Sequence, residues 1–287
     1  MGYPTGRPAT WFVTGASRGL GLELVAQLLD RGDNVAATTR SAQRLTDALQ
    51  ARSASTGRLL AVEVDLRDPA DVDAAVRKTV ERFASLDVVV NNAGYGFLAA
   101  VEETGPDAVK NMLDVQVTGV WNVLRSTLPV LRAQGGGHVV NVSSVLGLVS
   151  VPGWALYCAG KYALEGLSES LAAEVADHGI KVTIVEPGYF RTNFLSEGSL
   201  ELPAETTDAY PAVREMVSTH LAMPGSQLGD PAKAAQQMIA NVVAGGTELR
   251  QILGSDSHVY ATAKVNALSA ALDANRDTAP LTDFTQS

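Results

Sequence analysis

Short apolar runs rich in β-branched residues alternate along this chain with segments in which apolar residues recur at helical spacing. The apolar residues in these runs are continuous rather than alternating, as expected of strands that are buried on both faces of a sheet. The runs lie at residues 11–14, 34–39, 59–64, 87–91, 138–142, 181–186 and 251–253. This alternation predicts an α/β fold, with a doubly wound parallel sheet of about seven strands and helices on both faces.

The helical segments between the runs have recognisable ends. Gly32 and Gly179 each follow a helical segment, and glycine commonly ends a helix. Asp68 and Asp230 each precede a proline, which combines an N-cap residue with proline at the first helical position. These signals agree with the periodicity of the apolar residues.

No repeat, low-complexity tract or Pro/Gly/Ser-rich linker divides the 287 residues, so we expect one domain over residues 1–287. Residues 192–229 form a long stretch in which no strand is expected, and connections of this length commonly contact substrate. We therefore expect a substrate loop at about 192–229. A C-terminal extension follows at about 255–287; its residues 261–274 have helical spacing and its last residues show no pattern.

Charge and composition exclude several classes of protein. The net charge is −9, from 22 Lys and Arg against 31 Asp and Glu, which argues against a nucleic-acid partner or an anionic membrane surface. No run approaches about 18 uncharged apolar residues, so we expect neither a membrane span nor export. The only cysteine, Cys158, excludes an internal disulfide, is expected to be small and buried, and suits a cytoplasmic location.

The histidines are scattered without metal-ligand spacing, so no metal site is expected. We expect each of them at the surface or at an edge of the sheet. They are His138, His178, His220 and His258.

The first predicted strand leads through the sequence TGASRGLG, residues 14–21, directly into a helical segment. Glycines at such a turn let backbone N–H groups and the helix N-terminus approach a pyrophosphate, which the helix dipole favours. The placement predicts a dinucleotide site. The candidate contacts in this loop are Gly15, Ser17, Arg18, Gly19, Leu20 and Gly21.

The glycine spacing is G-x-x-x-G-x-G, and the sequence NNAG, residues 91–94, follows the fourth predicted strand. In both features the chain resembles the compact branch of the short-chain dehydrogenase/reductase family. The extended branch, which includes sugar epimerases and dehydratases, has the spacing T-G-x-x-G-x-x-G. The resemblance covers most of the chain, thins after about residue 254, and implies a single-domain Rossmann fold that binds a nicotinamide dinucleotide.

The end of the second predicted strand bears on the choice between NAD and NADP. An NAD enzyme places a carboxylate there, whereas this chain reads AATTR and presents Arg40. Arg40 and Arg18 could hold a 2′-phosphate from two sides, unless both are only solvated loop residues. Because NADP-preferring members of the family carry basic residues at these positions, the resemblance implies NADP(H). It further implies cofactor contacts from Asp65, Leu66, Asn91, Ala93, Gly94, Pro187, Gly188 and Thr192.

Tyr157 and Lys161 stand four residues apart in a helical segment, which places their side chains on one face. A phenol has a reference pKa of about 10, and a neighbouring ammonium favours the phenolate and moves the pKa toward neutrality. In the family this tyrosine exchanges the proton, and the lysine also holds the nicotinamide ribose. The family serine stands thirteen residues before the tyrosine, which selects Ser144 to stabilise the substrate oxygen. Ser143 is expected to bond the backbone at the strand end.

Gln116 departs from the family pattern. It stands three residues before Gly119, where the family usually has an asparagine that holds a water linking the lysine to solvent. Glutamine keeps the amide and adds a methylene. We therefore expect an active enzyme with a modified proton relay, and Gln116 completes the catalytic candidates.

Apolar residues flank the predicted reacting groups, which favours a hydrophobic substrate. They are Phe97, Val145, Leu146, Val149, Trp154, Tyr189, Phe190 and Phe194. The sequence thus predicts an NADP(H)-dependent ketoreductase or alcohol dehydrogenase that interconverts a hydrophobic ketone or aldehyde and its alcohol. Steroid-like, polyketide-like, retinoid-like and small aryl ketones remain open.

Two other functions are compatible with the fold. One is an NADP(H)-binding sensor or scaffold that has lost the chemistry, and the other is an epimerase or dehydratase, which the glycine spacing disfavours. The family resemblance also suggests that the helices bearing Tyr157 and Gln116 pair across a two-fold axis, giving a homodimer or homotetramer.

Overall fold

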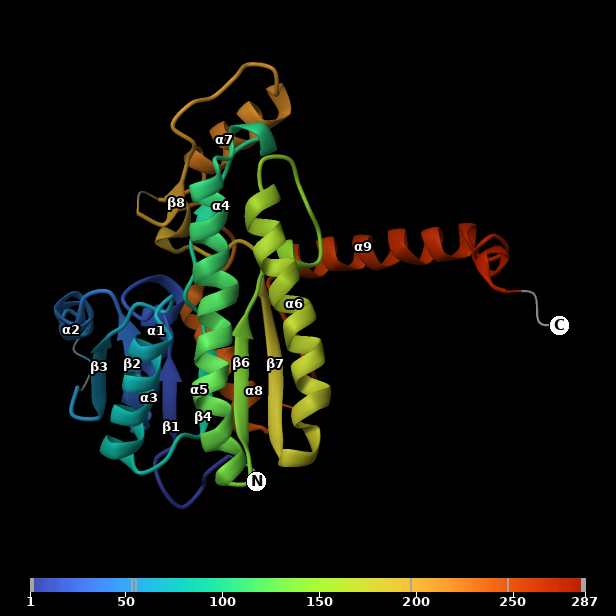
Figure 1. Ribbon diagram of the computed structural model, residues 1–287. Helices are drawn as coiled ribbons and strands as arrows, with labels where there is room; N and C mark the ends of the chain where they lie inside the picture. Colours follow the sequence, from blue (N-terminus) through green and yellow to red (C-terminus); the bar gives the residue numbers. More distant parts are fainter. Residues whose placement is uncertain (1–2, 53, 55, 197, 247, 285–287) are drawn as a thin grey trace.

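A parallel seven-stranded sheet forms the centre of the protein, in the order β3-β2-β1-β4-β6-β7-β9 (Figure 1). The computed structural model describes residues 3–52, 54, 56–196, 198–246 and 248–284. The strands are β1 (Thr10–Val13), β2 (Asn34–Thr39), β3 (Leu59–Glu63), β4 (Val88–Asn91), β6 (Gly137–Val142), β7 (Ile180–Pro187) and β9 (Arg250–Leu253). The strand order reverses between β1 and β4, which confirms the predicted doubly wound Rossmann fold.

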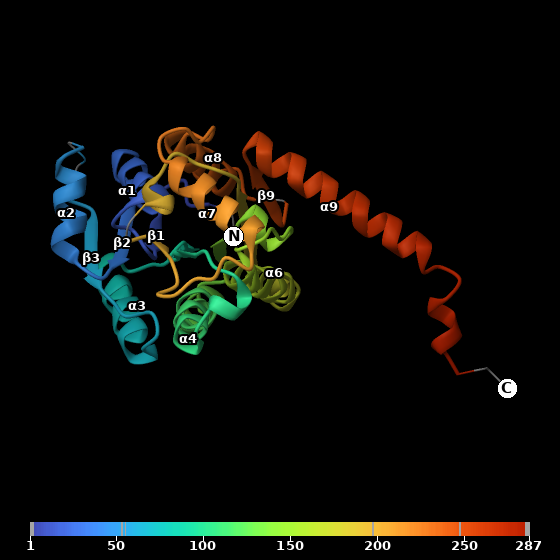
Figure 2. The same cartoon turned by 90° about the horizontal axis from the view of Figure 1, so that it is seen from above.

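Helices cover both faces of this sheet (Figures 1 and 2). One layer contains α1 (Gly19–Asp30), α2 (Ala42–Gln50) and α8 (Pro231–Val243), and the other contains α3 (Pro69–Phe83), α5 (Gly119–Ala133) and α6 (Ala155–Val175). Trp11 and Val13 of β1 pack into the first layer's core, whereas Phe12 packs into the second. Successive side chains of a strand point to opposite faces, so an unbroken apolar run supplies both cores.

The helix-end signals of the sequence are confirmed. Gly32 and Gly179 have φ angles of 83° and 67°, in the left-handed region that favours glycine. The Asp68 carboxylate accepts a hydrogen bond from the Ala70 N–H at the start of α3. Asp230 caps α8 in the same way.

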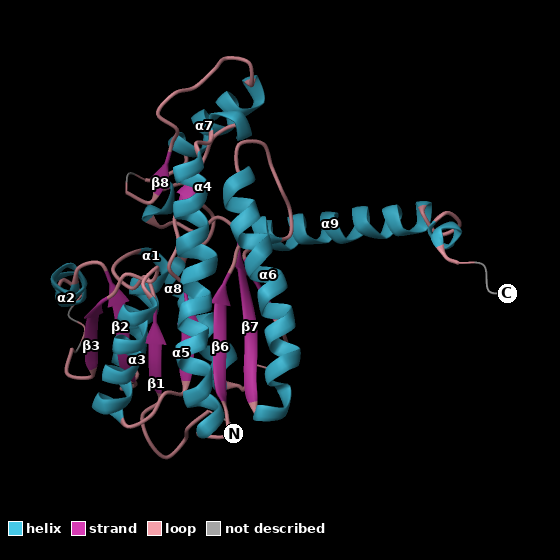
Figure 3. Ribbon diagram, viewed as in Figure 1, coloured by secondary structure: helices cyan, strands magenta, loops and turns pink. Residues whose placement is uncertain are grey.

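Further elements lie beyond the carboxyl ends of the strands (Figure 3). β5 (Gly96–Phe97) pairs with β8 (Leu200–Glu201), so the expectation of no strand between residues 192 and 229 is wrong. A two-residue strand is too short to produce a run in the sequence. The same region contains α4 (Pro106–Leu113) and α7 (Pro211–Ala222). A π-helical segment, Asp114–Thr118, joins α4 to α5. Elsewhere along the chain, short 3₁₀ helices lie at Val101–Glu103, Val145–Gly147, Ala176–His178, Asn193–Leu195 and Ala279–Thr282.

The last long helix, α9 (Ser255–Ala274), projects away from the body of the molecule (Figure 2). It begins before the helix expected at residues 261–274, and most of its side chains are exposed. Residues 285–287 of the C-terminal extension lie outside the described residues. Among the described residues, no helix combines the length and the apolar character that a membrane span requires.

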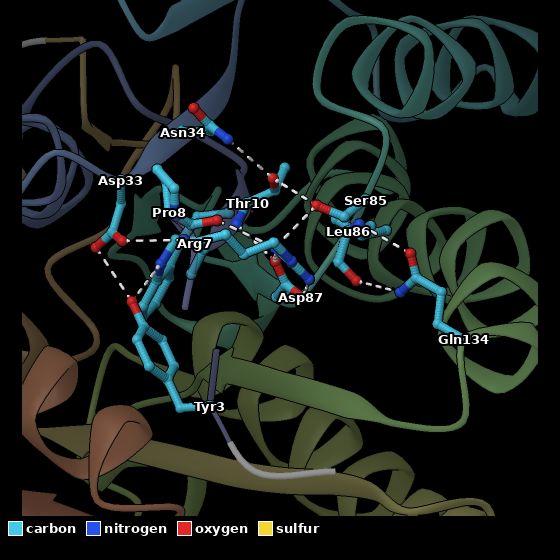
Figure 4. Close-up of polar contacts among 12 residues, drawn as sticks. Tyr3, Arg7, Pro8, Thr10, Asp33, Asn34, Ser85, Leu86, Asp87 and Gln134 are labelled. Atoms are coloured by element: carbon cyan, nitrogen blue, oxygen red, sulfur yellow. Dashed lines mark hydrogen bonds and ion pairs between the residues drawn. The ribbon is translucent and has the colours of Figure 1, made fainter. Parts of the chain in front are cut away.

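Polar contacts hold the amino ends of the strands together (Figure 4). The Arg7 guanidinium donates to both carboxylate oxygens of Asp87, at 2.7 and 2.6 Å. Asp87 also accepts from the Thr10 N–H at 2.8 Å, and the Gln134 amide bonds both backbone groups of Leu86. These contacts fix the start of β1 beside the start of β4. They lie at the amino ends of the strands, opposite the site described next.

Candidate active site

A cavity of about 970 Å³ opens at the carboxyl ends of the strands, where doubly wound sheets bind ligands. All the candidate site residues except Asn91 and Gln116 line it. Those that do are Gly15, Ser17, Arg18, Gly19, Leu20, Gly21, Arg40, Asp65, Leu66, Ala93, Gly94, Ser144, Tyr157, Lys161, Pro187, Gly188 and Thr192.

The glycine loop is held in place by the segment after β4. The Asn92 amide donates to the carbonyl oxygens of Thr14 and Gly15, at 3.0 Å each. A methyl group built on Gly21 would meet the same amide and would lie 2.5 Å from the Gly15 oxygen, so only glycine fits there. Asn92 is therefore a positioning residue that the sequence analysis missed. Its place in the NNAG sequence marked it as a candidate, but the sequence could not show which of the two adjacent asparagines faces the glycine loop.

The start of α1 leaves backbone donors open to the cavity. α1 begins at Gly19 without a side-chain cap and without an acidic residue in its first turn. Its first N–H groups have no partner within the helix, and the helix dipole favours an anion at this end. The loop thus fits the pyrophosphate of a dinucleotide.

Two arginines share the next part of the cavity. Arg18 in the glycine loop donates to the Gly198 oxygen, and burial together with the charge of Arg40 lowers the pKa of Arg18. Arg40 follows β2 and is exposed. Glu63, a carboxylate that also lines this region, accepts from the Ala42 N–H at 2.9 Å and so caps α2. The two guanidinium charges are therefore close enough to repel each other.

Asp65 lies farther along the same side of the cavity. The Arg67 guanidinium donates to its carboxylate at distances of 2.6 to 3.1 Å. These hydrogen bonds hold the pKa of Asp65 below its ordinary value. The backbone oxygen of Leu66 accepts from the Asn122 amide at 2.9 Å.

The side chains of Tyr157 and Lys161 project from α6 into the cavity and are both buried. The Lys161 Nζ lies 5.5 Å from the centre of the Tyr157 ring and donates to the Val142 oxygen at 2.9 Å. Burial lowers the pKa of Lys161 to about 8, although the Glu165 carboxylate acts in the opposite direction. Burial raises the pKa of Tyr157, against the effect of the Ser144 hydroxyl. The phenol pKa was expected to move toward neutrality; in the chain by itself it moves upward, and desolvation is the largest cause.

The two serines after β6 have different partners, and one of them, Ser143, differs from expectation. Ser144 Oγ accepts from the Leu146 N–H at 3.1 Å, and its hydroxyl also acts on the Tyr157 phenol through a side-chain hydrogen bond. The Ser143 hydroxyl is buried without a hydrogen-bond partner among the described residues. The expectation that it bonds the backbone is therefore wrong. The Ser143 N–H is already paired with the Val185 oxygen at 2.8 Å.

Gln116 and Asn91 lie behind the cavity wall. Gln116 Nε2 donates to the Tyr95 oxygen at 2.8 Å, and its Oε1 is buried without a partner among the described residues. A methyl group built on Gly94 would lie 3.7 Å from both the Gln116 amide carbon and Lys161 Nζ, so these two side chains border the same small space. The Asn91 amide instead donates to Asn141 at 2.8 Å, inside the sheet.

Aromatic and aliphatic side chains line the part of the cavity next to Ser144 and Tyr157, which we call the substrate half. Seven of the eight apolar residues expected to flank the reacting groups line it, and Phe97 instead borders a separate depression near Glu103. His138 and His220 are buried, so the expectation that every histidine is at the surface or an edge is wrong for these two. His220 lines the cavity, and sequence reasoning missed it because α7 was not expected.

Comparisons with known proteins agree with this geometry. The family model described as short chain dehydrogenase matches residues 9–201. Oxidoreductase BOA17 of Botryotinia fuckeliana is 36% identical over 260 residues, which cover 91% of this chain and 94% of that protein. Oxidoreductase UcpA of Escherichia coli is 33% identical over 271 residues, covering 93% and 95%.

Among solved structures, a short-chain dehydrogenase from Streptomyces avermitilis superposes with a TM-score of 0.86 at 36% identity, covering 96% of this chain and 100% of that one. The residues that the family model matches, 9–201, include the glycine loop, strand ends and α6, which line the cavity described above. The chain therefore belongs to the short-chain dehydrogenase/reductase family of NAD(P)-dependent oxidoreductases.

Proposed function

We propose that this protein is an NADP(H)-dependent carbonyl reductase or alcohol dehydrogenase that interconverts a hydrophobic ketone or aldehyde and its alcohol. The observation that carries the proposal is the convergence of Ser144, Tyr157 and Lys161 on the cavity that also contains the glycine loop. The apolar lining of the substrate half supports a hydrophobic substrate.

Each catalytic side chain has a role that follows from its contacts. When bound, NADPH supplies a hydride to the carbonyl carbon. Ser144 donates its hydrogen to the carbonyl oxygen, and Tyr157 gives the proton that completes the alcohol. Burial keeps the phenol protonated, which is the form that a proton donor needs. The Lys161 ammonium donates a hydrogen bond to the Val142 oxygen, which keeps its charge near the Tyr157 ring. In this position it also binds the nicotinamide ribose.

The replacement Tyr157→Phe tests the chemistry. We expect NADPH oxidation against a panel of ketones and aldehydes to fall by about 100-fold or more, because the proton donor is lost. NADPH affinity, measured by nucleotide fluorescence, should change by less than about threefold, since the ring remains. If neither protein turns over any carbonyl while both bind NADPH, the sensor or scaffold function is favoured.

The preference for NADP rests on Arg18 and Arg40, whose charges are close enough to interact. Replacing either by alanine should lower kcat/KM for NADPH by about tenfold or more, the effect of losing a charge-assisted hydrogen bond to phosphate. The value for NADH should change much less, because NADH lacks the 2′-phosphate. Equal rates of the wild type with NADH and NADPH would contradict this part of the proposal.

We also propose a homodimer or homotetramer built on the face formed by α5 and α6. Trp121 of α5 is 53% exposed and Tyr162 of α6 is 38% exposed, and large aromatic side chains favour interfaces. Light scattering of the wild type should give the mass of a dimer or tetramer, and Trp121→Glu should reduce it. A monomeric wild type would rule this assembly out.

A further inference from the structure

The row of side chains that begins with Tyr157 and Lys161 continues along α6. Glu165 and Glu169 follow at the same four-residue spacing, so each side chain lies about one helical turn beyond the one before it. Tyr157, Lys161 and Glu165 are buried, whereas the Glu169 side chain is 56% exposed. The row therefore leads from the reacting phenol to the surface, and its first carboxylate follows the catalytic ammonium.

Glu165 meets a second buried carboxylate at Arg250. The Arg250 guanidinium of β9 donates from one nitrogen, Nη1, to Glu165 Oε2 at 2.5 Å and also to Glu186 Oε1 of β7. Its other terminal nitrogen donates to Glu169. Glu186 is fully buried. Two buried carboxylates thus lie side by side at one nitrogen, and a single cation does not balance both of their charges.

The two carboxyl groups have the arrangement that a shared proton requires. Glu165 Oε1 and Glu186 Oε2 are buried and have no donor among the described residues. Burial, the charge of Glu165 and a side-chain hydrogen bond with it raise the pKa of Glu186 to about 7. Because an ionised carboxylate can only accept, a hydrogen bond between two carboxyl groups needs a proton on one of them. We call Glu165 and Glu186 the carboxyl pair.

The carboxyl pair lies behind the end of β6, close to the catalytic groups. A methyl group built on Gly147 would lie 2.6 Å from Ser143 Oγ and 2.7 Å from Glu165 Oε1, so both oxygens lie against this glycine. The Val142 oxygen, just before Ser143, accepts from Lys161 Nζ at 2.9 Å. The Glu165 carboxylate also favours the ammonium form of Lys161. The pair is therefore coupled to the cation that the proposed reaction uses.

The elements packed around the carboxyl pair bring other titratable groups near it. Asp256 of α9 accepts from the Tyr189 N–H at 2.7 Å. His138 of β6 is bonded to Thr183 at 2.9 Å, and Thr183 points to the opposite face of the sheet from Glu186 because strand side chains alternate. The charged groups in contact or electrostatic interaction with the pair are Lys161 of α6 and Arg250 of β9, and Arg250 also holds Glu169.

We propose that Glu165 and Glu186 share one proton at neutral pH and that this carboxyl pair keeps Lys161 charged; the proposal rests on the function proposed above. As the pH rises through about 7, the pair loses its proton and gains a negative charge. That charge opposes the loss of the proton from Lys161, whose pKa is about 8. Glu165 is thus a positioning residue that acts through Lys161, and the pair extends the charged state of the ammonium to higher pH.

Infrared spectroscopy of the protein without cofactor or substrate tests for the shared proton. The C=O band of a protonated carboxyl group should be present at about pH 6 and lost by about pH 8, whereas ordinary glutamates, with a reference pKa of about 4.3, are ionised at both. Glu186→Gln should remove the band. Glu165→Gln should move its loss to lower pH, because Glu186 no longer has a negative neighbour. Glu169→Gln, which changes the exposed carboxylate on the same guanidinium, should keep the band.

The pH dependence of NADPH binding tests the link to Lys161, since this ammonium binds the nicotinamide ribose in the proposed function. The Kd of the wild type, measured by nucleotide fluorescence, should rise above about pH 8. In Glu165→Gln the rise should begin about one pH unit lower, because an opposite charge near the ammonium is lost. Glu165→Asp retains the charge and should restore part of the range, and Glu169→Gln should match the wild type. A Glu165 that only anchored Arg250 would alter stability without moving this profile.

The outcomes separate the two proposals. The carboxyl pair would be overturned if the wild type has no band that titrates near pH 7, if the band survives in Glu186→Gln, or if the NADPH profiles of the wild type and Glu165→Gln coincide. If the band and the shifted profile are both found but no carbonyl compound consumes NADPH, the pair is supported and the proposed reductase function fails.

Discussion

At the residue scale, burial and charge act against each other around Tyr157 and Lys161. The two side chains share one face of α6, and both are withdrawn from water. Desolvation favours the neutral form of each, which raises the phenol pKa and lowers the ammonium pKa. The sequence spacing indicated the attraction between these groups, but the cost of desolvation depends on how deeply the fold buries them.

Gln116→Asn should shift the pH dependence of the reaction. Shortening the side chain withdraws an amide oxygen from the space that it shares with Lys161. Moving the negative end of this unpaired amide dipole away from the ammonium disfavours the charged form of Lys161 and lowers its pKa. The alkaline limb of the kcat/KM profile should therefore move to lower pH. An unchanged profile and unchanged turnover would show that glutamine is neutral at this position.

His138 should make folding sensitive to acid. Burial, reinforced by the charge of Lys181, lowers the pKa of His138 from 6.5 to about 4. Its contribution to stability is present above pH 6.5 and is lost as the pH falls through 4, because the unfolded chain binds the proton first. The total loss is about 3 kcal/mol.

The comparison with His138→Gln isolates this contribution. Between pH 7 and pH 4, the difference in unfolding free energy between the wild type and the variant should shrink by about 3 kcal/mol in urea titrations. The pKa of Glu186 is raised to about 7, chiefly by burial, which gives the opposite slope, but this term is common to both proteins and cancels. A difference that is constant with pH would contradict the assignment.

At the scale of elements, the cofactor end depends on contacts between segments far apart in the chain. The loop before α1 is tied to the segment after β4 through Asn92, and it is tied to residue 198 through Arg18. A methyl group built on Gly19 would contact Thr192 at 3.6 Å, just after β7. The carboxyl ends of β1, β4 and β7 thus shape one site, because parallel strands present the same ends at one edge.

Gly21→Ala should weaken cofactor binding more than it weakens the fold. The added methyl group would meet the Asn92 amide and the Gly15 oxygen, which must move apart and displace the donors at the start of α1. We expect the Kd for NADPH to rise by about tenfold or more. Gly57→Ala is a matched control, because a methyl group there meets nothing within 4 Å. Equal Kd values for both variants would show that the loop tolerates the displacement.

At the scale of the whole molecule, the carboxyl ends and the amino ends of the strands have separate roles. The carboxyl edge opens into the cavity, whereas the amino edge is closed by the ion pair between Arg7 and Asp87 and its neighbouring contacts (Figure 4). These contacts hold together the amino ends of strands whose opposite ends carry the site. Stability and chemistry can therefore be altered independently.

Asp87→Ala should lower stability without impairing turnover. The change removes the partner of Arg7 and leaves the Thr10 N–H without its acceptor. We expect a loss of about 2 kcal/mol in unfolding free energy, measured in urea. Asp177→Ala removes an exposed carboxylate and should change stability by less than about 0.5 kcal/mol. A fall in kcat/KM of Asp87→Ala at a temperature where it remains folded would show that the two edges are coupled.

Much of the fold and of the site could be predicted from local signals. The apolar runs identified all seven strands of the main sheet, and the glycine pattern and the Tyr157–Lys161 spacing selected residues that line the cavity. β5 and β8 could not be predicted, because two-residue strands carry no periodicity. Ser143 and Ser144 have the same chemistry in the sequence, and only their partners in the fold distinguish them.

The sequence by itself determined the class of fold and the nucleotide end, since apolar periodicity and glycine placement act over short distances along the chain. Tertiary structure alone decided which of two adjacent asparagines faces the glycine loop, how far burial moves the pKa values of Tyr157 and Lys161, and that Tyr189 meets His220 in the cavity. These features depend on packing between elements that are distant in sequence. Such packing sets both the partners and the solvent exposure of a side chain.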